Sequence, residues 1–273
     1  MTYASLTLAR LGLSVGALIG VDELASTATE LDLLRAAGVD VRLELLEHGP
    51  VFQNIERPTG RVQIALSPSD RLNPRSVPAA WASARGWFFG PVADELDDGW
   101  ADVVHADAHV ATGWQGLLRV VEAGEGVRRK APMANDLVAR TDLMGVSRDD
   151  LDADIELDEL CRLLRPGAML VLPAAGRGGL AMTAAASGAI DLRRWPGIPA
   201  DALVDATGAG DVFLAAMLAA RLEPRLIGGS ADGHRDLRLA AAAASLVIER
   251  PGLYGVPDRA ALRARVARTP SSG

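Results

Sequence analysis

The sequence predicts an α/β protein with a mostly parallel sheet that is covered by helices on both faces. Short apolar segments of strand length alternate with helix-like segments along most of the chain, which is the pattern of such a sheet. Hydrophobic residues make up 49% of the 273 residues, which is enough for a large buried core. No internal repeat or linker divides the chain, so we expect one domain over residues 1–273.

The amino-terminal elements follow from apolar spacing and from turn residues. We expect helices over 2–11 and 27–37, strands over 15–21 and 39–46, and a proline-rich loop over 67–80. Gly38 stands where a left-handed residue would end the second helix. Strand-like runs at 51–56 and 61–66 flank Pro58-Thr59-Gly60 and predict a hairpin, so residues of about 40–66 form a small inserted appendage.

The rest of the chain continues this alternation. The expected strands are 87–89, 102–107, 143–146, 168–172 and 180–184, and the expected helices are 133–140, 155–165, 210–221, 236–249 and 258–268. A glycine-rich loop is expected over 226–234.

Composition and charge exclude several classes of protein. Lys and Arg number 28 against 35 Asp and Glu, a net charge of −7, whereas a nucleic-acid-binding surface needs a basic stripe. The longest apolar run, Leu11–Val21, is too short to cross a bilayer and ends in acidic residues without a cleavage site. The single cysteine, Cys161, rules out an intramolecular disulfide and is compatible with a reducing compartment. We expect a cytoplasmic protein that binds neither nucleic acid nor a membrane.

One stretch carries chemistry: Asp205 to Asp211 (DATGAGD), followed by the apolar helix VFLAAMLAA. The small residues Gly208, Ala209 and Gly210 allow a tight turn that exposes successive backbone N–H groups. They stand at a helix start, where N–H groups are unpaired and the dipole is positive, so the place suits a phosphate. Asp211 is then positioned to accept the proton of a hydroxyl group that attacks a phosphoryl group.

The alternative interpretation of this stretch is structural: Asp211 caps the helix and the glycines only make a turn. A bare G-x-G-D would favour that interpretation. The seven-residue pattern, with an acid at each end and an apolar helix behind it, favours function. The sequence contains no G-x-x-x-x-G-K-[ST], G-x-G-x-x-G or H-E-x-x-H motif, so the chemistry depends on DATGAGD.

DATGAGD resembles the second signature of the ribokinase-like (PfkB) family of sugar and nucleoside kinases. Weaker similarities follow in order along the chain, at 9–12 (ARLG), 38–42 (GVDVR), Phe52, 60–63 (GRVQ), 115–119 (QGLLR) and 240–255. The resemblance implies a three-layer α/β/α sandwich with a small β lid. It also implies transfer of the ATP γ-phosphate to an alcohol.

The resemblance assigns roles to residues of the motif and of its surroundings. Asp211 would be the general base, and the backbone of Gly208, Ala209 and Gly210 would form the anion hole. Asp205 and Thr207 match positions that bind a monovalent cation such as K⁺ in some members. The residues expected on the cofactor side are Thr207, Gly178, Gly179 and Ser245.

A magnesium site is implied by residues 147–150 (SRDD), which stand where the family has an N-x-x-E motif that organises Mg²⁺ through water. Ser147 replaces Asn and Asp150 replaces Glu, so both positions keep oxygen atoms, with a shorter reach at Asp150. We therefore expect ATP and Mg²⁺ as cofactors, with Asp150 and Asp205 as the metal-side residues.

Two features depart from the family pattern. The family's first strand, with a substrate-binding Asp, and its Gly-Gly pair have no counterpart before Met1. We therefore expect an unpaired sheet edge and a true start upstream. In 170–179 (LVLPAAGRGG), Pro173 and Ala175 replace the Thr and Gly that follow the strand beside ATP. Proline removes a backbone donor, so weakened nucleotide binding would follow.

Candidates for substrate contact lie near the amino terminus and on the lid. Tyr3 falls at the substrate-contacting Asn position of the sugar kinases. Arg61 and Gln63 lie on the predicted lid, where they contact substrate or pair with acidic residues.

The H-x-D-x-H run of His105, Asp107 and His109 could place three ligands on one face of a strand. A polar strand end is the simpler interpretation. Because ligands bind at the carboxyl-end rim of open α/β sheets, Asp107 is a further candidate for the substrate cleft.

Three hypotheses of function remain. The first is an ATP-dependent kinase acting on a hydroxyl of a sugar, polyol or nucleoside-like small molecule. The second is a catalytically weakened or silent ribokinase-like protein that binds a sugar or nucleotide. The third is a truncated product that does not fold alone. Substrate identity stays open, and exposed lid edges could pair two protomers into a homodimer.

Overall fold

The computed structural model describes residues 1–57, 60–227 and 233–269, with side chains described except at 56, 57, 60, 61, 227, 233 and 234. The helices are α1 (Thr2–Arg10), α2 (Glu30–Ala36), α3 (Asp136–Arg140), α4 (Leu157–Leu163), α5 (Ala209–Leu222), α6 (Gly233–Val247) and α7 (Arg259–Arg268). The strands are β1 (Gly16–Val21), β2 (Asp40–Leu45), β3 (Val51–Arg57), β4 (Gly60–Ser67), β5 (Gly86–Phe89), β6 (His109–Gly113), β7 (Arg119–Val120), β8 (Arg128–Arg129), β9 (Leu143–Gly145), β10 (Met169–Pro173), β11 (Gly179–Ala184) and β12 (Ile190–Trp195).

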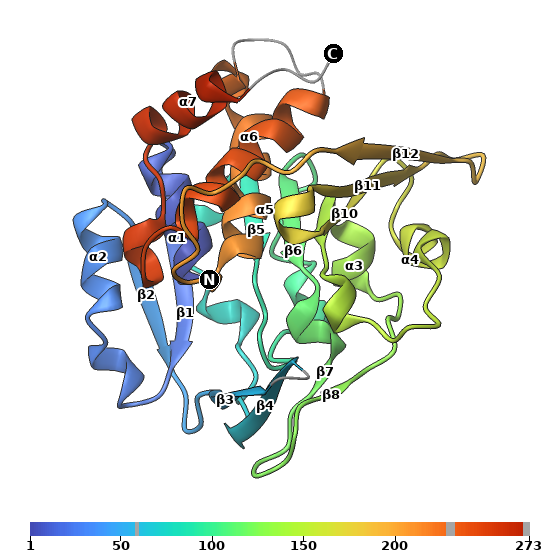
Figure 1. Cartoon of the computed structure of the whole chain (residues 1–273). Helices are drawn as coiled ribbons and strands as arrows, with labels where there is room; N and C mark the ends of the chain where they lie inside the picture. The colour runs from blue at the N-terminus through green and yellow to red at the C-terminus, as the bar shows by residue number, and fades with distance from the viewer. Residues whose placement is uncertain (58–59, 228–232, 270–273) are drawn as a thin grey trace.

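The main sheet has six strands in the order β12-β11-β10-β9-β6-β5 (Figure 1). The contacts from β5 through β6 and β9 to β10 are parallel, and β11 and β12 add two antiparallel strands at one edge. β1 and β2 form a separate parallel pair. The predicted α/β fold with a mostly parallel sheet is confirmed.

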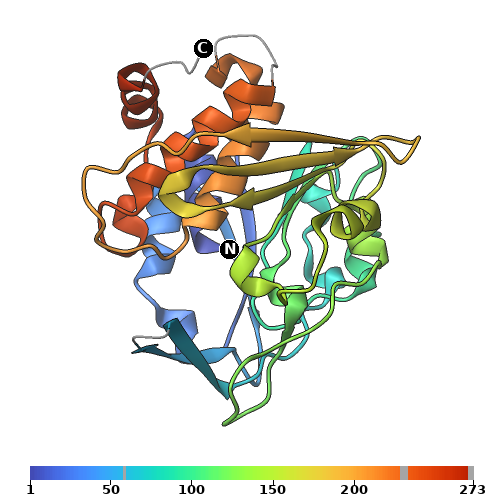
Figure 2. The same cartoon turned by 45° about the vertical axis from the view of Figure 1, so that its right-hand side comes forward.

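Helices cover both faces of the main sheet, as alternating strand residues show. In β10, Val171 packs into the core that contains α1, α5 and α6, whereas its neighbours Leu170 and Leu172 pack into the core that contains α3 and α4. Successive strand residues point to opposite faces, so both faces are buried. Figure 2 shows α5 and α6 on one side of β10–β12 and α4 on the other. The three-layer arrangement follows.

The lid is smaller than predicted. The hairpin of β3 and β4 forms as expected, but the predicted segment 40–66 starts too early, because β2 pairs in parallel with β1. Figure 1 shows the hairpin beyond the carboxyl ends of β1 and β2. Residues 124–127 extend the hairpin: the amide of Val127 donates to the carbonyl of Gln63 at 2.9 Å, and Ala65 donates to Glu125 at 2.9 Å.

The strand predicted over 102–107 is wrong. These residues form turns, and β6 starts only at His109. One guanidinium replaces the strand partner: Arg140 donates to the carbonyls of His105, Ala106 and Ala108 at 2.7, 3.0 and 3.0 Å. Because these carbonyls are satisfied by a side chain, the segment needs no neighbouring strand.

Strand β12 was not predicted. Its central residues Asp191, Arg193 and Arg194 are polar, and Leu192 is 46% exposed. Charged residues are typical of an edge strand, where they prevent pairing with other chains. Because of these charged residues, the sequence of β12 lacks the apolar run that predicts the other strands.

Helix α5 lies at the centre of the molecule. All its residues from Val212 to Ala220 are buried, which agrees with a sequence that is apolar on every side. It packs on α6, α1 and the sheet strands β5, β6 and β9. The predicted end of α2 is also confirmed, because Gly38 has a left-handed φ of +82°.

We predict that Gly116→Ala destabilises the protein. Gly116 follows β6, and a Cβ at this position would overlap the carbonyl group of Pro91. Backbone cannot move aside as a flexible side chain can, so the free energy of unfolding should fall by about 1–3 kcal/mol. Urea denaturation measures the change. Gly126→Ala is the matched control, because a Cβ at 126 would have no heavy atom within 4 Å, and an equal effect of both substitutions would contradict the explanation.

Candidate functional site

The direction of α5 decides where the DATGAGD segment lies. At the carboxyl end of α5, Leu222 packs against Gly86 at the start of β5, and Arg221 lies near the carbonyl of Asp142, just before β9. These contacts place the end of α5 at the amino edge of the parallel strands. Its amino terminus therefore lies at the carboxyl edge, where α/β proteins bind their ligands.

Asp205 shapes the loop that leads into α5. Its Oδ1 accepts a hydrogen bond from the amide of Thr207 at 2.9 Å, and its Oδ2 accepts one from the amide of Gly252 at 2.9 Å. Gly208 is the N-cap residue of α5 and has a left-handed φ of +77°. The loop thus turns sharply into the helix at a residue type that tolerates this conformation.

The first turn of α5 presents free backbone donors. In the described part of the chain, the amides of Gly210 and Asp211 have no hydrogen-bond acceptor, and no side chain caps the helix. α5 has 14 residues, so its dipole adds a positive potential at this end. The predicted anion cradle formed by the backbone of residues 208–210, next to the free amide of Asp211, therefore has the electrostatic character that a phosphoryl group requires.

The carboxylate of Asp211 lies beside these amides. Asp211 is half-buried, and no hydrogen bond or ion pair of its side chain is found among the described residues. A carboxylate that is partly shielded and not engaged by a cation can accept a proton from a bound hydroxyl group. The arrangement can therefore combine anion binding and proton transfer within one helical turn.

Tyr3 lies against the loop. The Cβ of any other residue at 208 would overlap the ring of Tyr3, so α1 and α5 meet at this point. Burial raises the pKa of the Tyr3 hydroxyl, and the nearby carboxylates of Asp205 and Asp211 raise it further. The prediction that Tyr3 contacts substrate is untested, but the structure brings this residue to the candidate cradle.

A second polar cluster connects two strand ends with the lid. Gln115 donates to Oδ1 of Asp150 at 2.8 Å, and the guanidinium of Arg119 lies 4.0 Å from the same oxygen. Arg119 also stands 5.9 Å from the ring centre of Phe52 on β3. Burial lowers the pKa of Arg119, and the charges of Asp150 and Glu95 oppose this effect.

The contacts in this cluster give a structural role to two short sequence runs that the sequence alone does not connect. Gln115 and Arg119 belong to the QGLLR run, and Asp150 belongs to SRDD. The lid residue Phe52 is far from both runs in sequence. Only the fold shows that these residues meet.

The structure gives less support for substrate contact by the two predicted lid residues, Gln63 and Arg61. Gln63 donates to Oδ1 of Asn54 across the hairpin at 2.8 Å, so its side chain has a structural partner. Arg61 lies on β4, and its side chain is outside what the structure describes.

The prediction that Asp107 lines the substrate cleft is wrong. Asp107 precedes β6 and therefore lies at the amino edge of the sheet, opposite to the cradle. Its side chain is 93% exposed and lies 3.8 Å from Nδ1 of His105. His109 starts β6, and its pKa is lowered by burial and by nearby arginines. The three residues do not share a strand face, so they form no metal cluster.

Gly178 and Gly179 have a structural reason to be glycines. A Cβ at 178 would overlap the carbonyl of Trp195, and a Cβ at 179 would overlap the ring of the same residue. Gly178 also has a φ of +94°. Their predicted contact with the nucleotide remains a prediction, because close packing of β11 on β12 already accounts for both residues.

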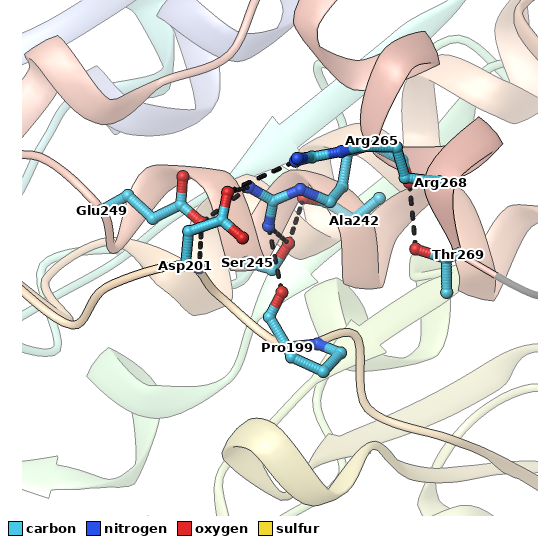
Figure 3. A network of polar contacts seen from close by, with 8 residues as sticks. All are labelled: Pro199, Asp201, Ala242, Ser245, Glu249, Arg265, Arg268 and Thr269. Atoms are coloured by element: carbon cyan, nitrogen blue, oxygen red, sulfur yellow. Dashed lines mark hydrogen bonds and ion pairs between the residues drawn. The ribbon is translucent and has the colours of Figure 1, made fainter.

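Ser245 lies inside a polar network around Arg265 (Figure 3). Ser245 is 4% exposed, donates to the carbonyl of Ala242 at 2.9 Å and accepts from Arg265 at 2.8 Å. Arg265 is also 4% exposed and contacts Glu249 at 2.6 Å and Asp201 at 3.3 Å. The structure therefore gives Ser245 a role in holding α6 to α7, and its predicted role toward a cofactor finds no support.

Preformed metal ligation is not found in the described residues. In the ranges 1–57, 60–227 and 233–269, no group of three His, Cys, Asp or Glu residues could hold a metal ion. None of the helices in these ranges has the length and apolar content that crossing a bilayer requires.

Comparison with known protein families gives a match in the carboxyl-terminal part of the chain. Residues 162–259 match the family described as pfkB family carbohydrate kinase. No curated protein matches the chain.

Several solved structures share the fold. A ribokinase from Arabidopsis thaliana, solved with ribose and ATP, is 18% identical with a TM-score of 0.69, over 98% of this chain and 86% of that chain. A pyrophosphate-dependent kinase in the ribokinase family is 17% identical with a TM-score of 0.72, over 96% and 90%. A nucleoside kinase from Methanocaldococcus jannaschii is 14% identical with a TM-score of 0.65, over 98% and 85%. At these identities the similarity shows the ribokinase-like fold.

We predict that Tyr3 ionises at a higher pH than a free tyrosine. The chain has two tyrosines, so the absorbance change that accompanies tyrosine ionisation should contain a component at higher pH. We expect this late component to disappear in Tyr3→Phe. In Asp211→Asn this component should shift toward lower pH, because one neighbouring negative charge is removed. A raised pKa in the folded state also means that the Tyr3 contribution to stability is present below a pH of about 10 and is lost above it. A late component that persists in Tyr3→Phe would contradict the assignment.

We predict that Arg265→Met lowers the free energy of unfolding by about 3 kcal/mol, because it leaves the carboxylate of Glu249 half-buried without its cation. Thermal or urea unfolding measures the loss. Arg193→Met is the control, because Arg193 is an exposed arginine whose side chain is 40% accessible and pairs only with Asp191 among the described residues. Equal losses in both variants would show that burial of the network is not the cause.

Proposed function

We propose that this chain is a member of the pfkB family of carbohydrate kinases, whose model matches residues 162–259, and that it transfers the γ-phosphate of ATP to a hydroxyl of a small polyhydroxylated molecule. Sugars, polyols and nucleoside-like compounds are the substrate class. The observation that carries the proposal is the first turn of α5, where unpaired amides and the carboxylate of Asp211 lie together.

The proposed reaction is an in-line displacement at the γ-phosphorus. The acceptor oxygen forms a bond to phosphorus while the bond from phosphorus to the β–γ bridging oxygen breaks, and ADP leaves. Asp211 takes the proton of the acceptor hydroxyl, which makes its oxygen a better nucleophile. The backbone amides of Gly208, Ala209 and Gly210 provide the anion hole, in which preorganised donors stabilise the negative charge of the transferred group.

The loop is held in position by groups outside the chemistry. Asp205 accepts hydrogen bonds from Thr207 and Gly252, and the ring of Tyr3 covers Gly208. Rigid support of this kind matters, because a displacement of about 1 Å between reacting groups can cost about 10²-fold in rate. We assign Tyr3 to the substrate side of the cradle, with its hydroxyl protonated at neutral pH.

Mg²⁺ and a monovalent cation belong to the proposal as partners of the nucleotide and of the loop. Mg²⁺ usually keeps several waters and binds through one or two carboxylates plus substrate phosphates. Asp150 and Asp205 do not form a metal centre by themselves: Asp150 is held by Gln115, and both carboxylate oxygens of Asp205 accept backbone amides. Mg²⁺ would therefore arrive with the phosphates of ATP, and the chain's own groups carry the proton transfer and the anion binding.

A second candidate is a protein that binds a sugar or nucleotide without turnover. The observation that favours it lies at the end of β10, where Pro173 offers no amide donor and Ala175 has a φ of +50°. Binding of ATP without release of ADP against a panel of sugars, polyols and nucleosides would support this candidate. The absence of any ATP binding in calorimetry would reject the kinase proposal.

We predict that Asp211→Asn lowers kcat by about 10²–10⁴-fold, because the amide cannot accept the proton, and leaves ATP affinity nearly unchanged. A coupled assay of ADP release measures turnover, and calorimetry measures binding. Asp191→Asn is the matched control, because Asp191 lies on edge strand β12 with 57% of its side chain exposed. Turnover that survives in Asp211→Asn would exclude Asp211 as the base.

A further inference from the structure

Basic side chains gather at the amino edge of the main sheet, opposite to the cradle. Arg221 belongs to the last turn of α5, Arg140 ends α3, and Arg165 follows α4. His109 starts β6 at the same edge and is exposed. The proposed phosphoryl transfer uses none of these side chains, so their arrangement calls for a separate explanation.

Asp142, just before β9, holds this cluster together. Its buried carboxylate pairs with Arg165 and accepts a hydrogen bond from the amide of Val110 at 2.8 Å. Its backbone carbonyl accepts a hydrogen bond from Arg221 at 3.5 Å. Val110 directly follows His109 in β6. One residue therefore fixes two guanidinium groups and the start of β6 within a small region.

The guanidinium of Arg221 has more donors than its contacts use. A guanidinium carries five N–H donors. Besides the long contact with the carbonyl of Asp142, Nη2 of Arg221 lies 4.0 Å from Sδ of Met169, which is a weak acceptor. Burial lowers the pKa of Arg221, the charge of Asp236 raises it, and the charge of Arg165 lowers it. Arginine stays charged in proteins, so a partly desolvated cation faces this edge with donors available.

Positive charge dominates where the cluster meets solvent. The pKa of His109 is lowered by partial burial and then by the charges of Arg221, Arg165 and Arg140. Arg85 adds a fourth guanidinium, since its carbonyl accepts the amide of His109 at 2.9 Å and its side chain donates to the last carbonyl of α5 at 3.4 Å. The two carboxylates already described and the carboxyl end of α5, about half a negative charge, offset only part of this charge.

We propose that Arg165, Arg221 and His109 form a binding site for a dianionic phosphate group, either free phosphate or a phosphomonoester. The planar donor fork of arginine matches the oxygens of a phosphate, and the imidazole supplies a further N–H donor. Arg165 is accessible to such a ligand, because 47% of its side chain is exposed. The site is independent of the proposed kinase reaction: it lies at the other end of the 14-residue α5, about 20 Å from the cradle.

The first test follows the imidazole signals of His109 by NMR in the unmodified chain. Sulfate is the probe, because its charge stays constant while histidine titrates. His109→Gln assigns the signal among the four histidines. We expect sulfate at about 10 mM to shift this signal and to raise the pKa of His109, because a bound anion stabilises the imidazolium. No change with sulfate, or an equal change with potassium chloride of the same ionic strength, overturns the proposal.

The second test uses the variants Arg221→Gln and His109→Glu with inorganic phosphate. The amide signals of β6 report the affinity in every variant. We expect each substitution to weaken binding tenfold or more, because one removes a cation and the other adds an anion. His109→Glu changes an exposed residue, so it tests the site even where Arg221→Gln fails to fold.

Arg193→Gln is the matched control for these variants. Arg193 lies on edge strand β12, 40% of its side chain is exposed, and its substitution also removes one positive charge. Unchanged phosphate affinity in this control supports the proposal. Unchanged affinity in His109→Glu, or an equal loss in Arg193→Gln, overturns it.

A further arm compares inorganic phosphate with glycerol 3-phosphate. Tighter binding of free phosphate supports the inorganic anion as the occupant, and tighter binding of the ester supports a phosphorylated metabolite. The amide signals of residues 208–211 report binding at the cradle in the same spectra. Shifts confined to these signals overturn the proposed second site and leave the kinase proposal intact. None of the readouts measures phosphoryl transfer, so they are separate from the outcome for Asp211.

Discussion

The burial of α5 is the constraint on which the rest of the structure depends. Residues from Val212 to Ala220 are buried on all sides of the helix, between the sheet and helices α1 and α6. A close-packed helix cannot rotate or slide without opening cavities or overlaps. Its amino terminus, and with it Gly208 and Asp211, is therefore held at the carboxyl edge of the sheet. The chemical groups of the cradle are exposed or half-buried, but their position is determined by the apolar residues behind them.

Strand direction, more than residue type, decides which acidic residues can act together. Asp107 and Asp211 are both aspartates near the start of an element: the first precedes β6, and the second lies in the first turn of α5. Asp107 precedes a parallel strand, whereas Asp211 starts a helix that runs back along the strands, so the two lie at opposite edges. The sequence predicted Asp211 correctly at a helix start, because small residues before an apolar run are a local signal. The strand predicted over 102–107 would end at Asp107 and place it at the carboxyl edge, whereas β6 begins only at His109, so Asp107 lies at the amino edge. The sequence does not show the contacts of Arg140 with the carbonyls of this segment, which take the place of a strand partner.

Local patterns predicted much of the fold and the position of DATGAGD at a helix start, whereas long-range polar contacts could not be predicted from the sequence. The hairpin, the end of α2 at Gly38 and the start of α5 all depend on neighbouring residues. The contacts of Asp150 with Gln115 and Arg119 join segments that are about 30 residues apart in the chain. Ser245 shows the same limit, since its partner Arg265 lies on another helix. For such residues a sequence position within a family pattern does not determine which group the side chain faces.

The first turn of α1 connects the cradle with a cavity of about 790 Å³ that is lined by residues of β1 and β5. Met1 and Thr2 line the cavity, while the ring of Tyr3, the next residue, lies against Gly208. Successive residues in a helical turn point in different directions, so one turn can contact both places. A shift of α1 into or away from the cavity would move Tyr3 relative to the left-handed residue of the loop. The packing of the sheet interior and the geometry of the proposed anion hole are therefore coupled through three adjacent residues.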